Sequence, residues 1–287
     1  MRTPTFRSLS LALLASSLLL TAGCNRDRQQ ESPLADLASA EDHGGADDEN
    51  ALSGDLIAAA APLDETVSAS PAAAGLDALA RLGGRCLTRT YVADTRTLTL
   101  DFGPTNCLCP DGRYRRGKIV VVFSGPDRRR HSGAVATRVG YFVNDNQHTG
   151  TRTFTAAPGR GAGSFDLDVN ASVIFANNGG THAWTAHREF TQTAGAATPT
   201  LTDDAYTVTG SATGTNRRGV SYSATIVQPL VKQFAPGCAR HFVAGTVNIV
   251  NARSQSMLLN YDPTGTQACD NIASVTVNGR TRTITLR

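Results

Sequence analysis

The sequence predicts an all-β fold, an antiparallel meander that forms a β-sandwich or a partly closed barrel, preceded by a disordered linker. Stretches such as Phe165–Val169 and Val220–Ile226 alternate apolar and polar side chains, as strands with one buried face do. Turn residues recur between these stretches, and the pair Asn278-Gly279 is a strong hairpin signal. Most connections are short, which favours antiparallel over parallel pairing.

The same patterns assign further strands along the C-terminal part of the chain. These are Ile119–Phe123, Thr137–Val143, Thr151–Thr155, Ala183–Phe190, Tyr206–Ala212, Phe242–Val250, Ser256–Tyr261, Ala273–Val277 and Arg280–Leu286. A segment of roughly 200 residues can form one ordinary core or two small ones. We predict that residues 86–287 form one all-β globular domain.

The segment before this domain has a different composition. Residues 25–85 contain twelve acidic side chains, four arginines and no aromatic residue, whereas residues 86–287 contain 21 basic and 12 acidic side chains. Such a segment lacks the apolar surface needed to offset its chain entropy. Residues 24–85 are therefore predicted to be a disordered acidic stalk, which as a flexible coil would span about 40 Å.

The N-terminal residues have the three-part layout of an export signal. Arg2 and Arg7 form a short basic region, the apolar run Leu9–Leu20 follows, and small residues come after it. The apolar run is about a dozen residues long, and a helix that crosses a bilayer needs about 20. The segment therefore predicts export and not a transmembrane helix.

The run Leu-Leu-Thr-Ala-Gly-Cys at Leu19–Cys24 resembles the lipobox of bacterial lipoproteins. The resemblance implies that residues 1–23 are a signal peptide. It also implies that lipid is attached covalently to Cys24 and that the attached acyl chains include palmitate. The alternative is an ordinary secretory signal in which Cys24 is incidental. A lipidated Cys24 would place the protein in the cell envelope, on the outer membrane. The sequence does not determine whether the protein faces the periplasm or the cell surface.

The other cysteines predict disulfides, because an exported chain meets an oxidising compartment. We pair Cys238 with Cys269, and Cys86 with either Cys109 or Cys107, which leaves one of the latter two unpaired. The spacing of Cys107 and Cys109 is shorter than that of structural zinc ligands, so no metal is predicted.

Arginines gather on both sides of the predicted strand Ile119–Phe123. The candidates for anion binding are Arg113, Arg115, Arg116, Arg128, Arg129 and Arg130. They could bind phosphate, sulfate, lipopolysaccharide or an acidic glycan. They could instead complement the acidic segment of the same chain, or form a solvated surface.

Two carboxylate pairs are candidates for glycan hydrolysis, which needs two carboxyl groups facing one cleft. They are Asp166 with Asp168, and Asp203 with Asp204. The first pair alternates with apolar residues, as on a solvent-facing strand, and the second resembles a turn. Neither pair is predicted to be catalytic.

Other catalytic and cofactor signals are missing from the sequence. It has no Gly-x-Ser-x-Gly, His-Glu-x-x-His, phosphate-loop or dinucleotide-binding motif, so no cofactor is predicted. His182 and His187 are five residues apart and would lie on opposite faces of a strand. Trp184, which shares a strand face with Arg188, is predicted to belong to the core.

The chain resembles uncharacterised β-rich exported lipoproteins of Bacteroidota. The resemblance rests on the lipobox, on the acidic segment and on the runs Cys107–Ser124, Tyr141–Asn146 and Asp203–Gly210. The resemblance covers most of the predicted domain. It implies export and lipid anchoring, but no activity and no catalytic residue.

We therefore predict a membrane-anchored envelope lipoprotein with a non-catalytic β-domain. This domain is expected to bind a protein or a glycan, and the glycan could be acidic. The alternatives are a glycan-active hydrolase of the cell envelope and a purely structural envelope lipoprotein. The lipid anchor makes the membrane a partner, and the predicted compartment argues against nucleic acid.

Overall fold

The computed structural model describes residues 32–62, 79–124, 133–198, 201–235, 238 and 241–286. The chain divides into two compact units, Met1–Ser32 and Pro33–Arg287, and the second contains the whole sheet. No helix in the described ranges is long and apolar enough to cross a membrane.

The described strands form one antiparallel sheet of 14 strands. Its first strands are β1 Thr88–Val92, β2 Thr97–Asp101, β3 Cys107–Leu108, β4 Tyr114–Phe123, β5 Ala134–Val143, β6 Asn146–Ala156 and β7 Phe165–Ile174. The others are β8 Thr181–Ala194, β9 Ala205–Thr215, β10 Ser221–Gln233, β11 Phe242–Asn251, β12 Ser256–Asn260, β13 Ile272–Val277 and β14 Arg280–Thr285. Neighbours in sequence pair with one another, except that β2 pairs with β4 and the short β3 also pairs with β4. The predicted antiparallel meander is confirmed.

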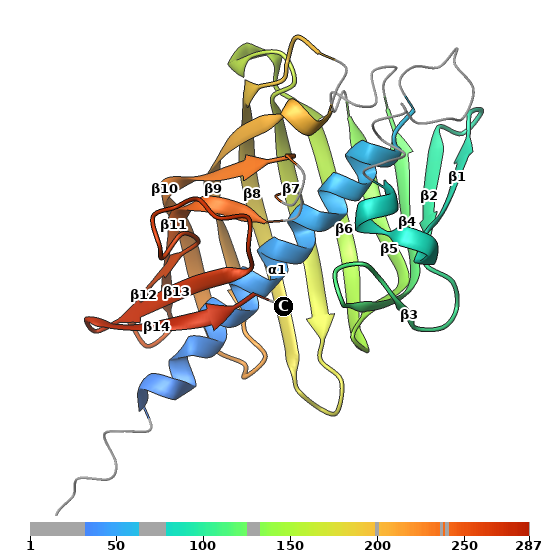
Figure 1. Cartoon of the computed structure of the whole chain (residues 1–287). Helices are drawn as coiled ribbons and strands as arrows, with labels where there is room; N and C mark the ends of the chain where they lie inside the picture. Colours follow the sequence, from blue (N-terminus) through green and yellow to red (C-terminus); the bar gives the residue numbers. More distant parts are fainter. Residues whose placement is uncertain are drawn as a thin grey trace, which may run out of the picture. The chain divides into compact units, whose positions relative to one another are not determined.

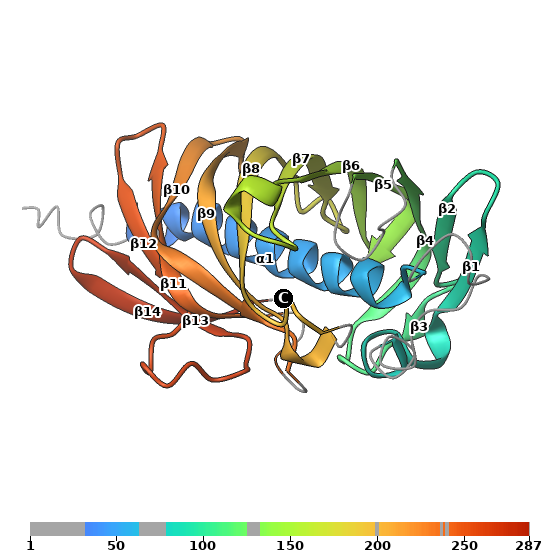
Figure 2. The same ribbon diagram turned by 90° about the horizontal axis from the view of Figure 1, so that it is seen from above.

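The sheet is curved and open. Strands β1 and β14 are the two ends of the pairing order and do not pair with each other. The strands curve around a long helix, which lies against the concave face (Figure 1 and Figure 2). Of the two predicted arrangements, the partly closed barrel describes this single sheet better than the two-sheet sandwich.

Side-chain alternation determines which residues face the helix. In β7, Phe165, Leu167 and Val169 are buried, whereas Asp166 is half-buried and Asp168 is exposed. Each stretch predicted as a strand overlaps an observed strand. Periodicity alone therefore identified most of the sheet, because most of its strands have one buried face.

The predicted hairpin at Asn278-Gly279 is also confirmed, since this pair connects β13 to β14. Asn278 has a φ of 50° and Gly279 a φ of 75°. Two successive left-handed residues are what a tight type I′ turn requires, and Asn followed by Gly is the pair that adopts them at the lowest cost.

The helix is α1, Ser32–Ala60, and it lies in the segment predicted to be a disordered stalk. Among residues 37–60 only Glu41 is exposed. The prediction of disorder is therefore wrong for residues 37–60, whereas residues 24–31 and 63–78 lie outside the described residues. The sequence did not predict the helix because its buried residues do not form an apolar stripe. The curved sheet surrounds the helix, and many of its buried side chains are carboxylates.

Apolar contacts also hold the helix. Leu52, Leu56 and Ile57, in its C-terminal third, are almost completely buried in the common core. Near the middle of the helix, a Cβ added to Gly44 would lie 2.9 Å from Leu286 and 3.4 Å from Leu259. Glycine is unfavourable within a helix, but at this position it lets the backbone pack close to β12 and to the residue after β14.

Two disulfides join described residues, Cys86–Cys107 and Cys238–Cys269, with Cα–Cα distances of 5.6 and 4.5 Å. The pairing of Cys238 with Cys269 is confirmed. For Cys86 the partner is Cys107, one of the two predicted alternatives, so the other alternative, Cys109, is wrong. Cys109 is a buried free cysteine, because the turn before β4 directs its side chain into the core. Each bridge closes a loop of moderate length and should contribute about 3 kcal/mol.

Non-reducing peptide mapping should therefore recover the linked pairs Cys86–Cys107 and Cys238–Cys269. Cys109 should react with an alkylating reagent only after unfolding, because it is buried and burial raises the pKa of its thiol. A peptide that links Cys86 to Cys109 would contradict the observed pairing.

Candidate functional site

The contact between helix α1 and the sheet is rich in charge. Acidic side chains along the helix meet basic side chains from the strands and turns that surround it. The helix contributes Glu41, Asp42, Asp47, Asp48, Glu49 and Asp55, and their basic partners are Arg113, Arg115, Arg188, Arg217, Lys232 and His241. We call this set the helix–sheet ion pairs.

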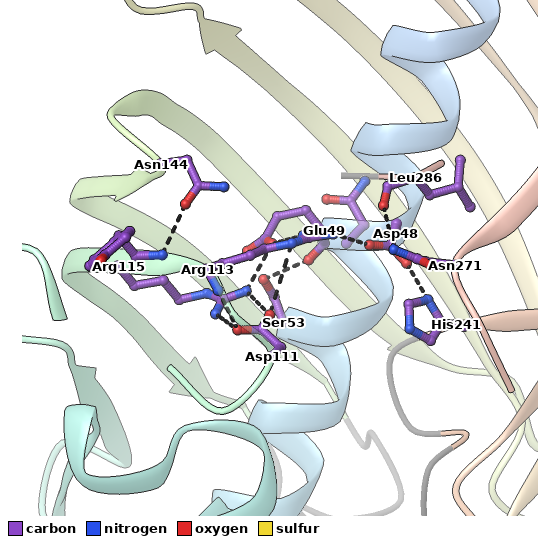
Figure 3. A network of polar contacts seen from close by, with 12 residues as sticks. Asp48, Glu49, Ser53, Asp111, Arg113, Arg115, Asn144, His241, Asn271 and Leu286 are labelled. Atoms are coloured by element: carbon purple, nitrogen blue, oxygen red, sulfur yellow. Dashed lines mark hydrogen bonds and ion pairs between the residues drawn. The ribbon is translucent and has the colours of Figure 1, made fainter. Parts of the chain in front are cut away.

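The densest part of the set surrounds Asp48 and Glu49 (Figure 3). Arg113 donates to Asp48 at 2.7 Å and to Glu49 at 3.1 Å, just before β4. Arg115, inside β4, lies 3.5 Å from Glu49. Tyr141 from β5 donates to the other oxygen of Glu49 at 2.9 Å. Both carboxylate oxygens of Glu49 are therefore bound by the sheet.

Further pairs lie on both sides of this cluster. Arg188 of β8 is 3.3 Å from Asp47, which is also 3.3 Å from His43. Towards the end of the helix, Lys232 of β10 donates to Asp55 at 2.6 Å. The helix is thus connected to distant strands of the sheet by separate charged contacts.

These contacts determine the ionisation of the buried carboxylates. Burial alone would raise the pKa of Glu49, but Arg115 and Arg113 outweigh it and hold this pKa well below its usual value. Burial opposes ionisation of Asp47 too, and Arg188 with His43 keeps its pKa low. Both side chains are therefore anionic near neutral pH, and each has a cationic partner, as buried charges require.

The predicted anion-binding arginines divide into three groups. Arg113 and Arg115 bind carboxylates of the chain's own helix, so the interpretation that they complement the acidic segment is confirmed, and the solvated interpretation is wrong for them. Arg116 pairs with the exposed Asp145 and lies over the Phe142 ring at 3.9 Å. The remaining three, Arg128, Arg129 and Arg130, lie outside the described residues.

A cavity of about 670 Å³ lies next to the ion pairs. Its walls come from the first half of helix α1, from the neighbouring ends of β5 to β8 and from β14. The polar side chains in these walls include Glu41, Glu49, Asn146, His148, Arg217 and Arg282. The cavity is within the range of about 300–1,000 Å³ typical of small-ligand sites.

Two histidines line this cavity and are held neutral. Burial, reinforced by Arg138, lowers the pKa of His148 to about 3. Its Nδ1 atom is buried and has no hydrogen-bond partner in the described part of the chain. Burial likewise lowers the pKa of His182 to about 3, and its Nε2 lies 2.7 Å from the Tyr222 hydroxyl.

The candidate carboxylate pairs do not form a catalytic cleft. Asp166 and Asp168 lie on the outer face of the sheet, where Asp166 pairs with Arg160 and Asp168 with His187. Asp203 accepts from Thr198, and Asp204 accepts from Gln192 at 2.9 Å. The two pairs therefore have local partners, and the outward position of Asp166 and Asp168 follows from strand alternation, as predicted.

One cluster on the outer face has the residue types of a metal site. Ligand atoms of Asp166, His187 and Glu189 lie within 4.8 Å of one another. These are oxygen and nitrogen donors suited to a divalent transition metal. Arg160 already pairs with Asp166, and Thr209 donates to Glu189 at 3.1 Å, so an ion would have to compete with existing contacts.

In β8, His182, Trp184 and His187 lie on the faces of the sheet that the alternation of side chains along a strand predicts. His182 and Trp184 are buried, whereas His187 is exposed on the opposite face. Arg188 was overlooked as a site residue, although it shares the buried face with Trp184. An arginine on the apolar face of a strand is the sequence signal for a buried acidic partner, because an unpaired buried charge is too costly.

Comparisons with known proteins gave no match to a family model, to a curated protein or to a solved structure. The geometry of the helix–sheet ion pairs and of the adjacent cavity is therefore the basis for a functional proposal.

Replacing Glu49 with Gln should lower the free energy of unfolding by about 1.5–3 kcal/mol, because Arg113 and Arg115 would each lose one buried anionic partner while Arg113 keeps Asp48 and Arg115 keeps Asp111. Urea unfolding followed by circular dichroism would measure the loss. The matched control is Glu41→Gln on the same helix. Glu41 is exposed and pairs with Arg217 at the surface, so its loss should cost no more than about 1 kcal/mol. Equal effects of the two substitutions would contradict the assigned roles.

Stability should fall as the pH is lowered from 7 towards 4. Burial lowers the pKa of His43 to about 4 and those of His148 and His182 to about 3, each from 6.5. In this window the unfolded chain binds protons at these three sites and the folded chain does not, so acid favours unfolding. Asp42 acts in the opposite direction, since burial raises its pKa to about 6, but it is a single group.

The urea midpoint measured at pH 7.5, 6 and 5 checks this expectation. The substitution His182→Gln should reduce the slope, because it removes one of the three titrating groups. A midpoint that stays constant or rises on acidification would contradict it.

Proposed function

We propose that this chain is a lipid-anchored protein of the bacterial cell envelope and that its folded unit binds a neutral glycan in the cavity beside helix α1. The lipobox-like run that ends at Cys24 supports the anchor. The cavity of about 670 Å³ carries the binding proposal, because it has the size of a ligand site and polar groups of both kinds in its walls.

The charge of the walls favours a neutral ligand. Three arginines and three carboxylates line the cavity, namely Arg113, Arg217, Arg282, Glu41, Asp42 and Glu49. Most of them already form pairs, as Arg113 does with Glu49 and Arg217 does with Asp42. A charged ligand therefore gains no net electrostatic attraction.

A polyhydroxylated ligand can use the remaining donors and acceptors. Asn146 accepts a hydrogen bond from the Ala176 amide, which leaves its amide NH₂ as a donor. Arg282 is exposed at the cavity wall and adds donors. Neutral sugars match such mixed hydrogen-bonding groups, because each hydroxyl both donates and accepts.

Binding is favoured over hydrolysis of the same ligand. The carboxylates of the cavity all come from one helix, and both oxygens of Glu49 are held by Arg113, Arg115 and Tyr141. Two carboxylates on opposite sides of a scissile bond, as glycoside hydrolysis needs, are not arranged here. A purely structural role would not explain the size and polarity of the cavity.

The proposal is tested by glycan-array screening and calorimetry on the purified chain and on Ile284→Trp. Ile284 lines the cavity from β14, and a tryptophan would fill part of it. The control is Thr281→Trp on the other face of the same edge strand, where Thr281 contacts Thr276. We expect binding of a neutral glycan that Ile284→Trp weakens at least tenfold and Thr281→Trp does not.

Three results would reject this assignment. The first is an array with no neutral glycan bound, and the second is a bound glycan whose affinity is the same in both variants. A preference for an acidic glycan would also contradict it, since the cavity walls carry balanced charge.

A further inference from the structure

We infer that one end of the sheet lies against an anionic lipid surface, an inference that rests on the proposed lipid anchor at Cys24. This end, called the basic end, consists of the turns 216–220, 252–255 and 278–279. The turns lie at the same end because of strand pairing: Tyr222 pairs with Asn251, and Met257 pairs with Val277.

Each of these three turns presents an exposed arginine. They are Arg218 between β9 and β10, Arg253 between β11 and β12, and Arg280 at the start of β14. Residues 216–220, 252–255 and 278–281 contain no carboxylate, and the carboxylates of the adjoining helix, Glu41 and Asp42, both pair with Arg217. At the opposite end of the same strands, the connections 195–204 and 261–271 carry Asp203, Asp204, Asp262 and Asp270, and the connection 234–241 carries Arg240 and His241. This half of the sheet is therefore polarised, with positive charge at one end and negative charge at the other.

Helix α1 begins beside the basic end. Asn216 donates to Ser39 at 2.8 Å, and the backbone amide of Arg217 donates to Asp42 at 2.8 Å. Figure 1 shows the helix starting at the lower left, below β12 to β14, and rising across the sheet from there. The chain therefore leaves the sheet at its basic end on the way back to Cys24.

The covalent distance from the anchor to the helix is short. Only eight residue steps separate Cys24 from Ser32, the first residue of the helix. Even a fully extended chain of this length spans at most about 28 Å. Ser39, where the helix contacts the basic end, lies seven residues further along the helix, which adds about 10 Å. An acylated Cys24 at the bilayer surface would thus keep the basic end closer to the lipid headgroups than the opposite end of the sheet.

Charge then decides which surface meets the headgroups. Arginines close to an anionic membrane each strengthen binding roughly fivefold, and the attraction decays over about 10 Å at moderate salt. The acidic turns of the opposite end would be repelled. A short tether and a polarised sheet therefore favour the same orientation.

The test uses the mature-length chain with Cys24→Ser, so that binding does not depend on acylation. Vesicles of 30% phosphatidylglycerol in phosphatidylethanolamine are compared with pure phosphatidylcholine vesicles in flotation assays at low and high salt. We expect binding to the anionic vesicles alone, lost at high salt. The triple variant Arg218→Gln/Arg253→Gln/Arg280→Gln should bind them at least tenfold more weakly.

The matched control removes the same charge elsewhere, as Arg81→Gln/Arg85→Gln/Arg96→Gln, three exposed arginines before β4. It should change binding less than threefold. No binding to anionic vesicles, or equal losses in the two triple variants, would overturn the inference. Binding of the basic-end triple variant with unchanged affinity would overturn it too.

Failure of the anchor itself is detected separately. Radiolabelled palmitate should enter the wild-type chain in cells but not the Cys24→Ser variant. Absent labelling would reject the anchor and with it the membrane contact in the cell, whatever the vesicles show. Glycan binding in the cavity is measured without lipid and can fail or succeed independently of both.

Discussion

The pairing of buried opposite charges between helix α1 and the sheet determines where the helix lies. Asp48 and Glu49 meet Arg113 and Arg115, and Asp55 meets Lys232 on a different part of the sheet. Removing one partner of such a pair leaves a charge without compensation in the interior, which is costly. A shift of the helix by one residue would break several pairs at once. The charges thus define the register of the helix, whereas the apolar side chains of Leu52 and Leu56 join it to the common core.

The strands could be predicted because the information that specifies them is local. Phe165, Leu167 and Val169 alternate with aspartates, and that pattern is sufficient to place one face inward. Helix α1 could not be found in this way. Its carboxylates resemble those of a solvated segment, and they become compatible with burial only next to arginines more than sixty residues away. The composition of a segment indicates how well that segment is solvated by water. It does not reveal oppositely charged side chains elsewhere in the chain that could pair with it.

The candidate site was predictable to a similar extent. Arg113 and Arg115 were identified as anion-binding, and the acidic segment was among the anions considered, because both stand out in charge. The cavity was not predicted, since its walls join residues near position 45 to residues near position 284. Arg188 and Lys232 were missed, although an inward-facing cation in an apolar strand pattern was visible in the sequence. Buried ion pairs are recognisable only when both partners are considered together.

The helix precedes the sheet in sequence but lies inside it in space. Asp48 pairs with His241, 193 residues later, and Asp47 accepts from Tyr261, 214 residues later. Gly44 packs against Leu286, one residue from the end of the chain. Contacts of such long range make folding slow, because a large loop must close before they form. Residues of the helix, which are synthesised before the whole sheet, are thus among the last to reach their final environment.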